Sequence, residues 1–128
     1  MHRLVANDEL LSRVAEHDIG FAGEMTYCGS RDLTVTNKIL YYLLAGLAVV
    51  ASDTVGQQEA AGQAPGAVSL YRSGDPRALA ECINVLFNSP AGLARAKAAA
   101  LQAAEQTFCW ERQEESLLQS VTQALSVR

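Results

Sequence analysis

The sequence predicts an α/β domain in which a three-stranded parallel sheet is flanked by helices, with two further helices at the C-terminal end. Three apolar segments of strand length alternate with segments whose apolar residues recur at helical spacing. Such alternation indicates a parallel sheet with right-handed crossovers, its strands lying in the order first-second-third. The 128 residues correspond to one domain, and three strands are about half the sheet of a complete doubly wound domain.

The first part of the chain is expected to contain a helix, a strand and a long loop. Asn7 is predicted to cap a helix that ends near His17, because two acidic residues would then lie at the positive end of the helix dipole. Residues 18–22 have the apolar character of a short strand. Residues 23–35 form a polar stretch without periodicity, and a loop of this length in a compact domain is often functional.

Residues 37–45 are predicted to form a helix, followed by a buried strand. The apolar residues at helical spacing are Ile39, Leu40, Leu43 and Leu44. Gly46 follows at the position where helices commonly end at a glycine. Residues 47–51 are a continuous apolar run, the pattern of a parallel strand that is buried on both faces. A loop at 52–56, a short helix at 57–62 and a third strand at 66–71 are expected next.

Two Xaa-Pro pairs mark the starts of the next helices. Asp75-Pro76 and Ser89-Pro90 each place a capping oxygen before a proline at the first helical position. The first of these helices is expected to end near Asn88, and the second near residue 106. The residues predicted to face inward from the first are Leu79, Ile83, Leu86 and Phe87.

A last helix is predicted to begin near Trp110, which is expected to anchor it to the body of the domain. The residues on one side of this helix are Trp110, Glu114, Leu117, Leu118, Val121 and Leu125. Their spacing is that of an amphipathic helix. Both of the last two helices are therefore expected to pack beside the sheet.

Composition and charge argue against several classes of protein. The net charge of −4 and the absence of a basic cluster argue against nonspecific nucleic-acid binding. Cys28, Cys82 and Cys109 have neither the number of a disulfide framework nor the spacing of a zinc site, so reduced thiols in a cytoplasmic protein are expected. The longest apolar run, 39–51, is too short to span a bilayer, and residues 1–11 have no apolar core of a signal peptide. No metal or cofactor is predicted.

Several motifs occur in a particular order along the chain. They are TNKILYYLLAGLAVVASD at residues 36–53, then Gly56 and Glu59, then Gly74-Asp75-Pro76, and finally Phe108-Cys109-Trp110. In this order and spacing they resemble the C-terminal part of a glycosyltransferase family 4 protein of the GT-B fold, over roughly residues 8–125.

The resemblance implies a partial Rossmann-like domain that binds a nucleotide-sugar, such as a UDP- or GDP-sugar. In GT-B enzymes two Rossmann-like domains face each other across a cleft, and the C-terminal one holds the donor. This chain would correspond to the last half or so of that donor domain. It would lack the acceptor domain and the basic pair that neutralises the diphosphate, so it is not expected to be catalytic alone.

The chain departs from the family pattern at two acidic positions. Family members commonly have two glutamates there, the second of which binds the donor ribose, whereas this chain has Leu33 and Tyr41, eight positions apart. A tyrosine hydroxyl makes a single hydrogen bond and cannot replace the bidentate contact of a carboxylate to a ribose diol.

The first candidate site lies at residues 34–38. The free backbone N–H groups of Thr36, Asn37 and Lys38 at a helix start, following Thr34, are suited to bind a phosphate, and Lys38 would add a positive charge. The alternative interpretation is that Thr36 is a simple N-cap and Lys38 a solvated side chain.

The second candidate site lies at residues 52–59, after the carboxyl end of a predicted parallel strand. Ligands of open α/β sheets bind at such ends, and Gly56 and Glu59 are the residues that match the family pattern. The alternative is that Gly56 only makes a turn and Glu59 stabilises the first turn of the next helix.

Two hypotheses about function follow. The first is a glycosyltransferase-like subdomain that binds a nucleotide-sugar. The second is a non-enzymatic interaction module that has kept the fold and lost the ligand site. Either would expose a strand edge and an apolar helix face, which predicts a homodimer.

Overall fold

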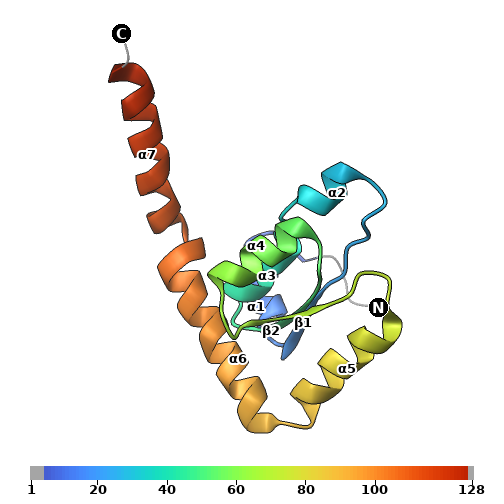
Figure 1. Cartoon of the computed structure of the whole chain (residues 1–128). Coiled ribbons are helices and arrows are strands. Elements are labelled where there is room, and N and C mark those ends of the chain that lie inside the picture. The colour runs from blue at the N-terminus through green and yellow to red at the C-terminus, as the bar shows by residue number, and fades with distance from the viewer. Residues whose placement is uncertain (1–4, 127–128) are drawn as a thin grey trace.

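The computed structural model describes residues 5–126, in which helices and parallel strands alternate as the sequence predicts (Figure 1). The strands are β1 (Ile19–Ala22), β2 (Ala48–Ser52) and β3 (Val68–Tyr71). The helices are α1 (Leu10–Val14), α2 (Gly29–Leu33), α3 (Asn37–Leu44), α4 (Val55–Gln63), α5 (Pro76–Phe87), α6 (Pro90–Ala103) and α7 (Trp110–Ser126), with the π-helical turn η1 (Ala104–Phe108) before α7. Residues 1–4, part of the segment in which no signal peptide is expected, lie outside the described residues.

The three strands form one parallel sheet in the order β1-β2-β3, which confirms the predicted topology. Ile19 lies opposite Ala48, and Val49 lies opposite Val68. The central strand β2 is buried along its whole length. This is the environment that its unbroken apolar sequence predicted, because a central strand of such a sheet has no face in contact with water.

Helices cover both faces of the sheet. The core on the face of α3, α4 and α6 contains Ala22, Ile39, Leu43, Val49, Ala51, Ala60, Ala64, Ala67, Ala100 and Ala103. The core on the opposite face, beneath α5 and the first part of α6, contains Ala48, Val50, Tyr71, Leu86 and Ala96. Neighbouring β2 residues alternate between the two cores, as the pleat of a strand requires.

The end of α3 is the predicted glycine stop. Gly46 has a φ of 69°, which an L-residue with a side chain rarely adopts. Its N–H donates to the Leu43 carbonyl, and the Leu47 N–H donates to the Tyr42 carbonyl. These two bonds make a Schellman motif, which satisfies carbonyls that the helix leaves free and turns the chain into β2.

Several predicted boundaries were wrong. Asn7 does not cap α1, which begins at Leu10. The residue at the cap position is Glu9, whose helical dihedrals differ from the extended backbone of a capping residue and whose side chain makes no capping hydrogen bond. The predicted loop 23–35 contains the short helix α2, whose sequence has no helical periodicity. Contacts with other elements stabilise it, such as the hydrogen bond from the Val55 N–H of α4 to Asp32. α4 begins at Val55 instead of 57, and Phe87 is exposed rather than turned inward.

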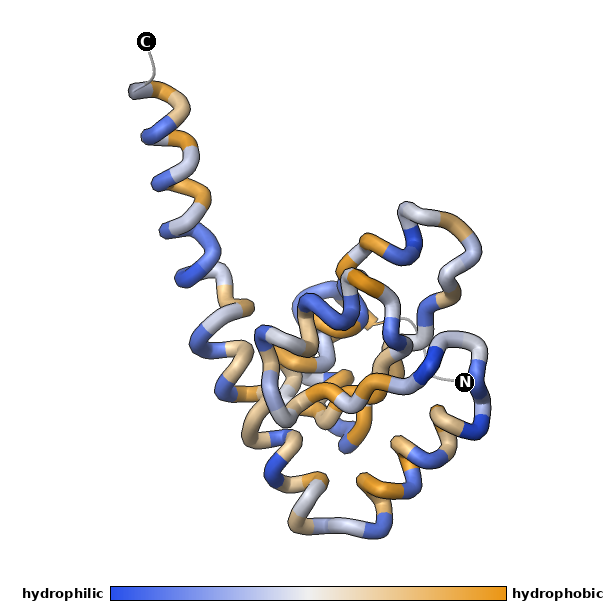
Figure 2. Tube along the Cα trace, viewed as in Figure 1, coloured by the Kyte–Doolittle hydropathy of each residue, from blue (hydrophilic) through white to orange (hydrophobic). Residues whose placement is uncertain are grey.

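The C-terminal helix α7 extends away from the sheet (Figure 1), so the expectation that both last helices pack beside it was wrong. None of the α7 residues is buried, and Trp110, the expected anchor, is 64% exposed. η1 and Cys109, whose backbone is extended, separate α6 from α7. Figure 2 shows hydrophobic residues recurring along α7. Across residues 5–126, no helix combines the length and apolar character needed to cross a membrane.

Candidate functional site

The segments that follow the three strands meet at the carboxyl edge of the sheet. The Glu24 N–H, just after β1, donates to Oγ of Ser52 at the end of β2, at 2.8 Å. Oγ of Ser73, just after β3, donates to the Glu24 carbonyl at 2.9 Å, and the Ser73 N–H donates to Oδ1 of Asp53 at 2.7 Å. These bonds hold the three loops together at the place where open α/β sheets bind ligands.

A buried carboxylate at this edge holds two cations. Glu24 is only 9% exposed; its Oε1 lies 2.7 Å from Nζ of Lys38, and its Oε2 lies 3.5 Å from a guanidinium nitrogen of Arg31. The side chains of Lys38 and Arg31 are each about half exposed. Two cations and one carboxylate leave one net positive charge, and the cations remain accessible to a ligand in water.

The start of α3 has no side-chain cap. Thr36 occupies the N-cap position with an extended backbone, but its hydroxyl accepts no N–H of the helix. This hydroxyl is inaccessible to water and has no hydrogen-bond partner among residues 5–126. No acidic residue lies in the first turn either. The positive end of α3, with Lys38 in its first turn, therefore remains uncompensated except by Glu24.

Residues 34–38 were interpreted either as a phosphate site or as a simple N-cap with a solvated lysine, and the structure does not fit the second interpretation. Thr36 is at the cap position but does not cap, and Lys38 is ion-paired instead of merely solvated. The Thr34 hydroxyl donates to the Ser30 carbonyl, and Asn37 is exposed in the first turn. Tyr41 is partly buried and lies one turn after Lys38, on the same side of α3.

The start of α4 is closed by the protein itself. Oδ1 of Asp32 accepts the Val55 N–H at 3.2 Å, and Oγ1 of Thr54 accepts the Gln57 N–H at 3.4 Å. Gly56 lies inside α4, so the interpretation of this glycine as a turn was wrong. A Cβ on Gly56 would lie 2.5 Å from the carbonyl carbon and oxygen of Thr34. The absence of a side chain allows α4 to contact the segment that leads into α3.

Glu59 is not in the first turn of α4, as its alternative interpretation required. It is exposed in the second turn and makes no hydrogen bond or ion pair with the other residues that the structure describes. The second candidate site thus separates into two parts: Gly56 is buried beside Thr34, and Glu59 does not join the Glu24 cluster.

Sequence reasoning missed Glu24, Arg31, Ser73 and the fully buried Gln57. Nε2 of Gln57 donates to Oγ of Ser52 at 2.8 Å, while its Oε1 has no partner among residues 5–126. Glu24 follows a predicted strand, so the convergence of parallel strand ends could have identified it. Arg31 had no such signal, because its position depends on the fold of α2.

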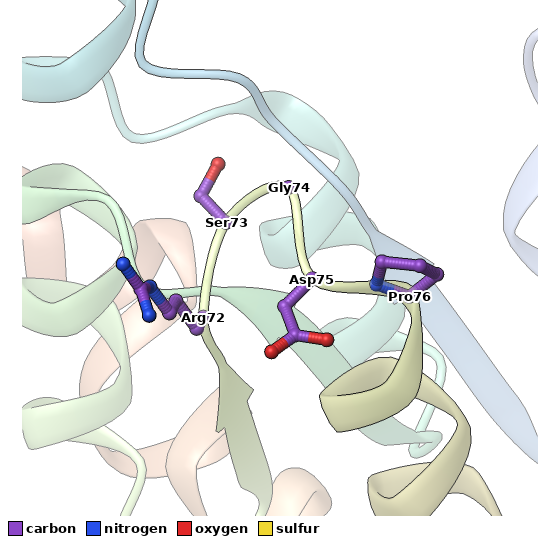
Figure 3. A pocket seen from close by; sticks show the side chains of 5 residues that line it. All are labelled: Arg72, Ser73, Gly74, Asp75 and Pro76. Atoms are coloured by element: carbon purple, nitrogen blue, oxygen red, sulfur yellow. The ribbon is translucent and has the colours of Figure 1, made fainter.

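Two shallow hollows adjoin the cluster on the α5 side. One, of about 310 Å³, is lined by residues Arg72, Ser73, Gly74, Asp75 and Pro76 (Figure 3). The other, also of about 310 Å³, is lined by Met25, Tyr71, Gly74, Asp75, Pro76 and Leu79. Burial raises the pKa of the Tyr71 phenol above its usual value, and a hydrogen bond with Ser52 acts in the opposite direction.

Comparison with protein-family models, with curated proteins and with solved structures finds no match to this chain. Within residues 5–126, no three His, Cys, Asp or Glu side chains come together in a way that could hold a metal ion. The site is therefore characterised by its own geometry: an uncapped helix start, two half-exposed cations and a buried carboxylate at the carboxyl edge of a parallel sheet.

Proposed function

We propose that the chain is a glycosyltransferase-like subdomain that binds a nucleotide-sugar, with the diphosphate at the start of α3. One observation supports this most directly. The uncapped first turn of α3 lies beside the accessible cations Lys38 and Arg31, at the carboxyl edge of the sheet. Free helix N–H groups, the helix dipole and two cationic side chains all favour a diphosphate.

The buried carboxylate of Glu24 has a positioning role in this proposal. It holds Nζ of Lys38 and the guanidinium of Arg31 near one another without a ligand, so binding a diphosphate requires little ordering of these long side chains.

In a complete enzyme of this kind the reaction would transfer a sugar from the nucleotide donor to an acceptor. Positive charge at the leaving diphosphate would stabilise the transition state, and Lys38 and Arg31 are the groups that would supply it here. The acceptor would be held by a second domain, so we infer binding and no transfer by these 128 residues alone.

Calorimetric titration of the chain with UDP, GDP and their sugars tests this proposal. Lys38→Ala is expected to weaken binding by about tenfold, because one charge-assisted contact is lost. Lys97→Ala is the matched control. Nζ of Lys97 pairs with Asp18, which precedes β1 at the opposite edge of the sheet, so this variant should bind like the original chain. No binding at millimolar ligand, or equal effects of the two variants, would contradict the proposal.

A second candidate function is a non-enzymatic interaction module that associates as a homodimer through a helix face or the sheet edge. The exposed apolar side of α7 favours it, since Leu117, Leu118 and Leu125 are each more than half exposed. β1 is also an edge strand, and edge strands readily pair with other chains.

Sedimentation equilibrium distinguishes this candidate. A dimer through α7 should dissociate on Leu118→Glu, whereas Val85→Glu, at another exposed apolar position on α5, should leave it intact. A chain that stays monomeric at high concentration would exclude the module. A dimer whose contact buries Lys38 would favour it over nucleotide-sugar binding, and one that leaves Lys38 free would be compatible with both.

A further inference from the structure

We propose that the first turn of α4 positions the Glu24 cluster, the buried carboxylate with its two cations, and that Gln57 does so through the hydroxyl of Ser52. This inference rests on the proposed function and deepens it. It gives the second candidate segment, residues 52–59, the role of holding the anion site in place rather than of contacting the ligand. Gln57 is fully buried, so its side chain cannot reach a ligand in water.

The hydroxyl of Ser52 joins four segments at the carboxyl edge of the sheet. Ser52 ends β2, and its Oγ accepts the Glu24 N–H and Nε2 of Gln57, each at 2.8 Å. A hydroxyl offers two lone pairs and one hydrogen. The two N–H groups use both lone pairs, and the hydrogen remains for Tyr71, which lies opposite Ser52 on β3. Gln57 therefore helps to fix the Ser52 oxygen at the place where it holds the backbone of Glu24.

The backbone of Glu24 is held on both sides. Its N–H donates to Oγ of Ser52, and its carbonyl accepts Oγ of Ser73 at 2.9 Å. With the backbone held, the side chain of Glu24 places its carboxylate 2.7 Å from Nζ of Lys38 and 3.5 Å from a guanidinium nitrogen of Arg31. Loss of the contact with Ser52 would loosen the carboxylate, and the two cations with it.

The first turn of α4 holds the other parts of the cluster as well. The Val55 N–H donates to Oδ1 of Asp32 at 3.2 Å, and Asp32 is the residue after Arg31. Gly56 lies against the backbone of Thr34, in the segment that leads into α3. These two residues and the one that follows them in α4 therefore position the guanidinium, the start of α3 and the carboxylate.

A glutamine at position 57 is not explained by its contribution to stability. Its Oε1 has no hydrogen-bond partner among residues 5–126, and a buried polar atom without a partner costs free energy. Methionine is also unbranched and of similar length, and it would fill the same space without this cost. What the amide of Gln57 adds is the N–H group that Ser52 accepts.

Calorimetry with inorganic pyrophosphate tests the inference, because this probe contains the diphosphate alone. Gln57→Met should weaken pyrophosphate binding about threefold, since cations that are no longer held in place must be ordered when the anion binds. Gln58→Met is the matched control in the same turn. Nε2 of Gln58 donates to the Asp53 carbonyl instead, so this variant should bind like the original chain. Equal effects of the two variants would overturn the inference.

A double-mutant cycle separates positioning from a merely structural role. Glu24→Ala leaves no carboxylate to position, so adding Gln57→Met to it should have no further effect on pyrophosphate affinity. The same threefold loss with and without the Glu24 side chain would overturn the inference.

A measurement without ligand distinguishes failure of this inference from failure of the proposed function. The carboxyl carbon resonance of Glu24 should move in Gln57→Met in the same direction as in Lys38→Ala, which removes the nearer cation. It should stay unchanged in Gln58→Met. If pyrophosphate does not bind and the resonance still moves, the proposed function alone is overturned. An unmoved resonance in Gln57→Met would overturn the positioning role.

A second comparison covers the case in which Gln57→Met does not fold. Asp32→Asn and Asp32→Ala both remove one negative charge, but only asparagine keeps an oxygen that can accept the Val55 N–H. Asp32→Ala should therefore bind pyrophosphate about threefold more weakly than Asp32→Asn, because Arg31 is then less well held. Equal affinities of these two variants would show that α4 does not position the cluster.

Discussion

Two helices, α3 and α4, begin at the same edge of the sheet, but their first turns are completed in different ways. In α4 the Val55 N–H is bonded to Asp32, the Gln57 N–H is bonded to Thr54, and Gly56 contacts the backbone of Thr34. In α3 no side chain caps the helix. The comparison shows that a helix can begin at the carboxyl edge and still have its first N–H groups occupied. Whether these N–H groups are free depends on whether side chains of the protein itself accept their hydrogen bonds, as they do in α4 and not in α3.

The charges sharpen this difference. α4 receives a carboxylate from α2, at the end where the dipole favours a negative charge. α3 has no acid in its first turn and has Lys38 there, a placement that the dipole disfavours. Glu24 compensates that charge from the segment after β1. One start is thus neutralised by the fold, whereas at the other two half-exposed cations share one buried carboxylate.

The largest effect on stability is expected from a side chain at Gly56, where α4 contacts the segment before α3. Gly56→Ala would place a Cβ 2.5 Å from backbone atoms of Thr34, and backbone cannot move aside as a flexible side chain can. We expect the free energy of unfolding to fall by about 2–4 kcal/mol, as measured by urea denaturation.

Gly62→Ala is the matched control in the same helix, because a Cβ there meets no atom within 4 Å. It should stabilise the protein by up to about 1 kcal/mol, since alanine is the better helix former. Similar stability changes for the two variants would show that Gly56 does not mark a close approach.

The capping difference predicts a smaller effect. Thr54→Val removes the hydroxyl that accepts the Gln57 N–H and should lower the free energy of unfolding by about 1 kcal/mol. Thr36→Val removes a hydroxyl that has no partner among residues 5–126 and should be neutral or slightly stabilising. Denaturation of both variants under the same conditions makes the comparison, and equal losses would mean that the two threonines have the same role.

The smallest effect is expected at the opposite edge of the sheet, where Lys97 pairs with Asp18. The hydrogen bond and charge of Lys97 hold the pKa of Asp18 below its usual value. The pKa of Asp18 is lower in the folded protein than in the unfolded chain, so the pair stabilises the protein at pH values above the usual aspartate pKa. This stabilisation is lost as the pH falls through the lowered pKa of the folded state. NMR titration should find the Asp18 midpoint returning upward in Lys97→Ala. An unchanged midpoint would show that the pair does not persist in solution.

Much of the fold could be predicted from the sequence because its signals are local. The β2 run, the Gly46 stop and the capping acid at Asp75 each depend on neighbouring residues, and all three were confirmed. The candidate site was predicted only in part. Residues 36–38 were identified as a helix start, whereas Glu24 and Arg31 come from segments without periodicity and were missed.

The sequence by itself determined the class of the fold and the order of the strands, and it predicted a candidate anion-binding helix start at residues 34–38. Apolar periodicity and turn chemistry are read within a few residues, so they need no knowledge of distant contacts. Only the tertiary structure decided that Asp32 accepts a hydrogen bond from the first turn of α4, that Glu24 pairs with Lys38 and that α7 extends away from the sheet. Each of these depends on which segments far apart in the chain become neighbours, because burial and charge pairing act through space rather than along the sequence.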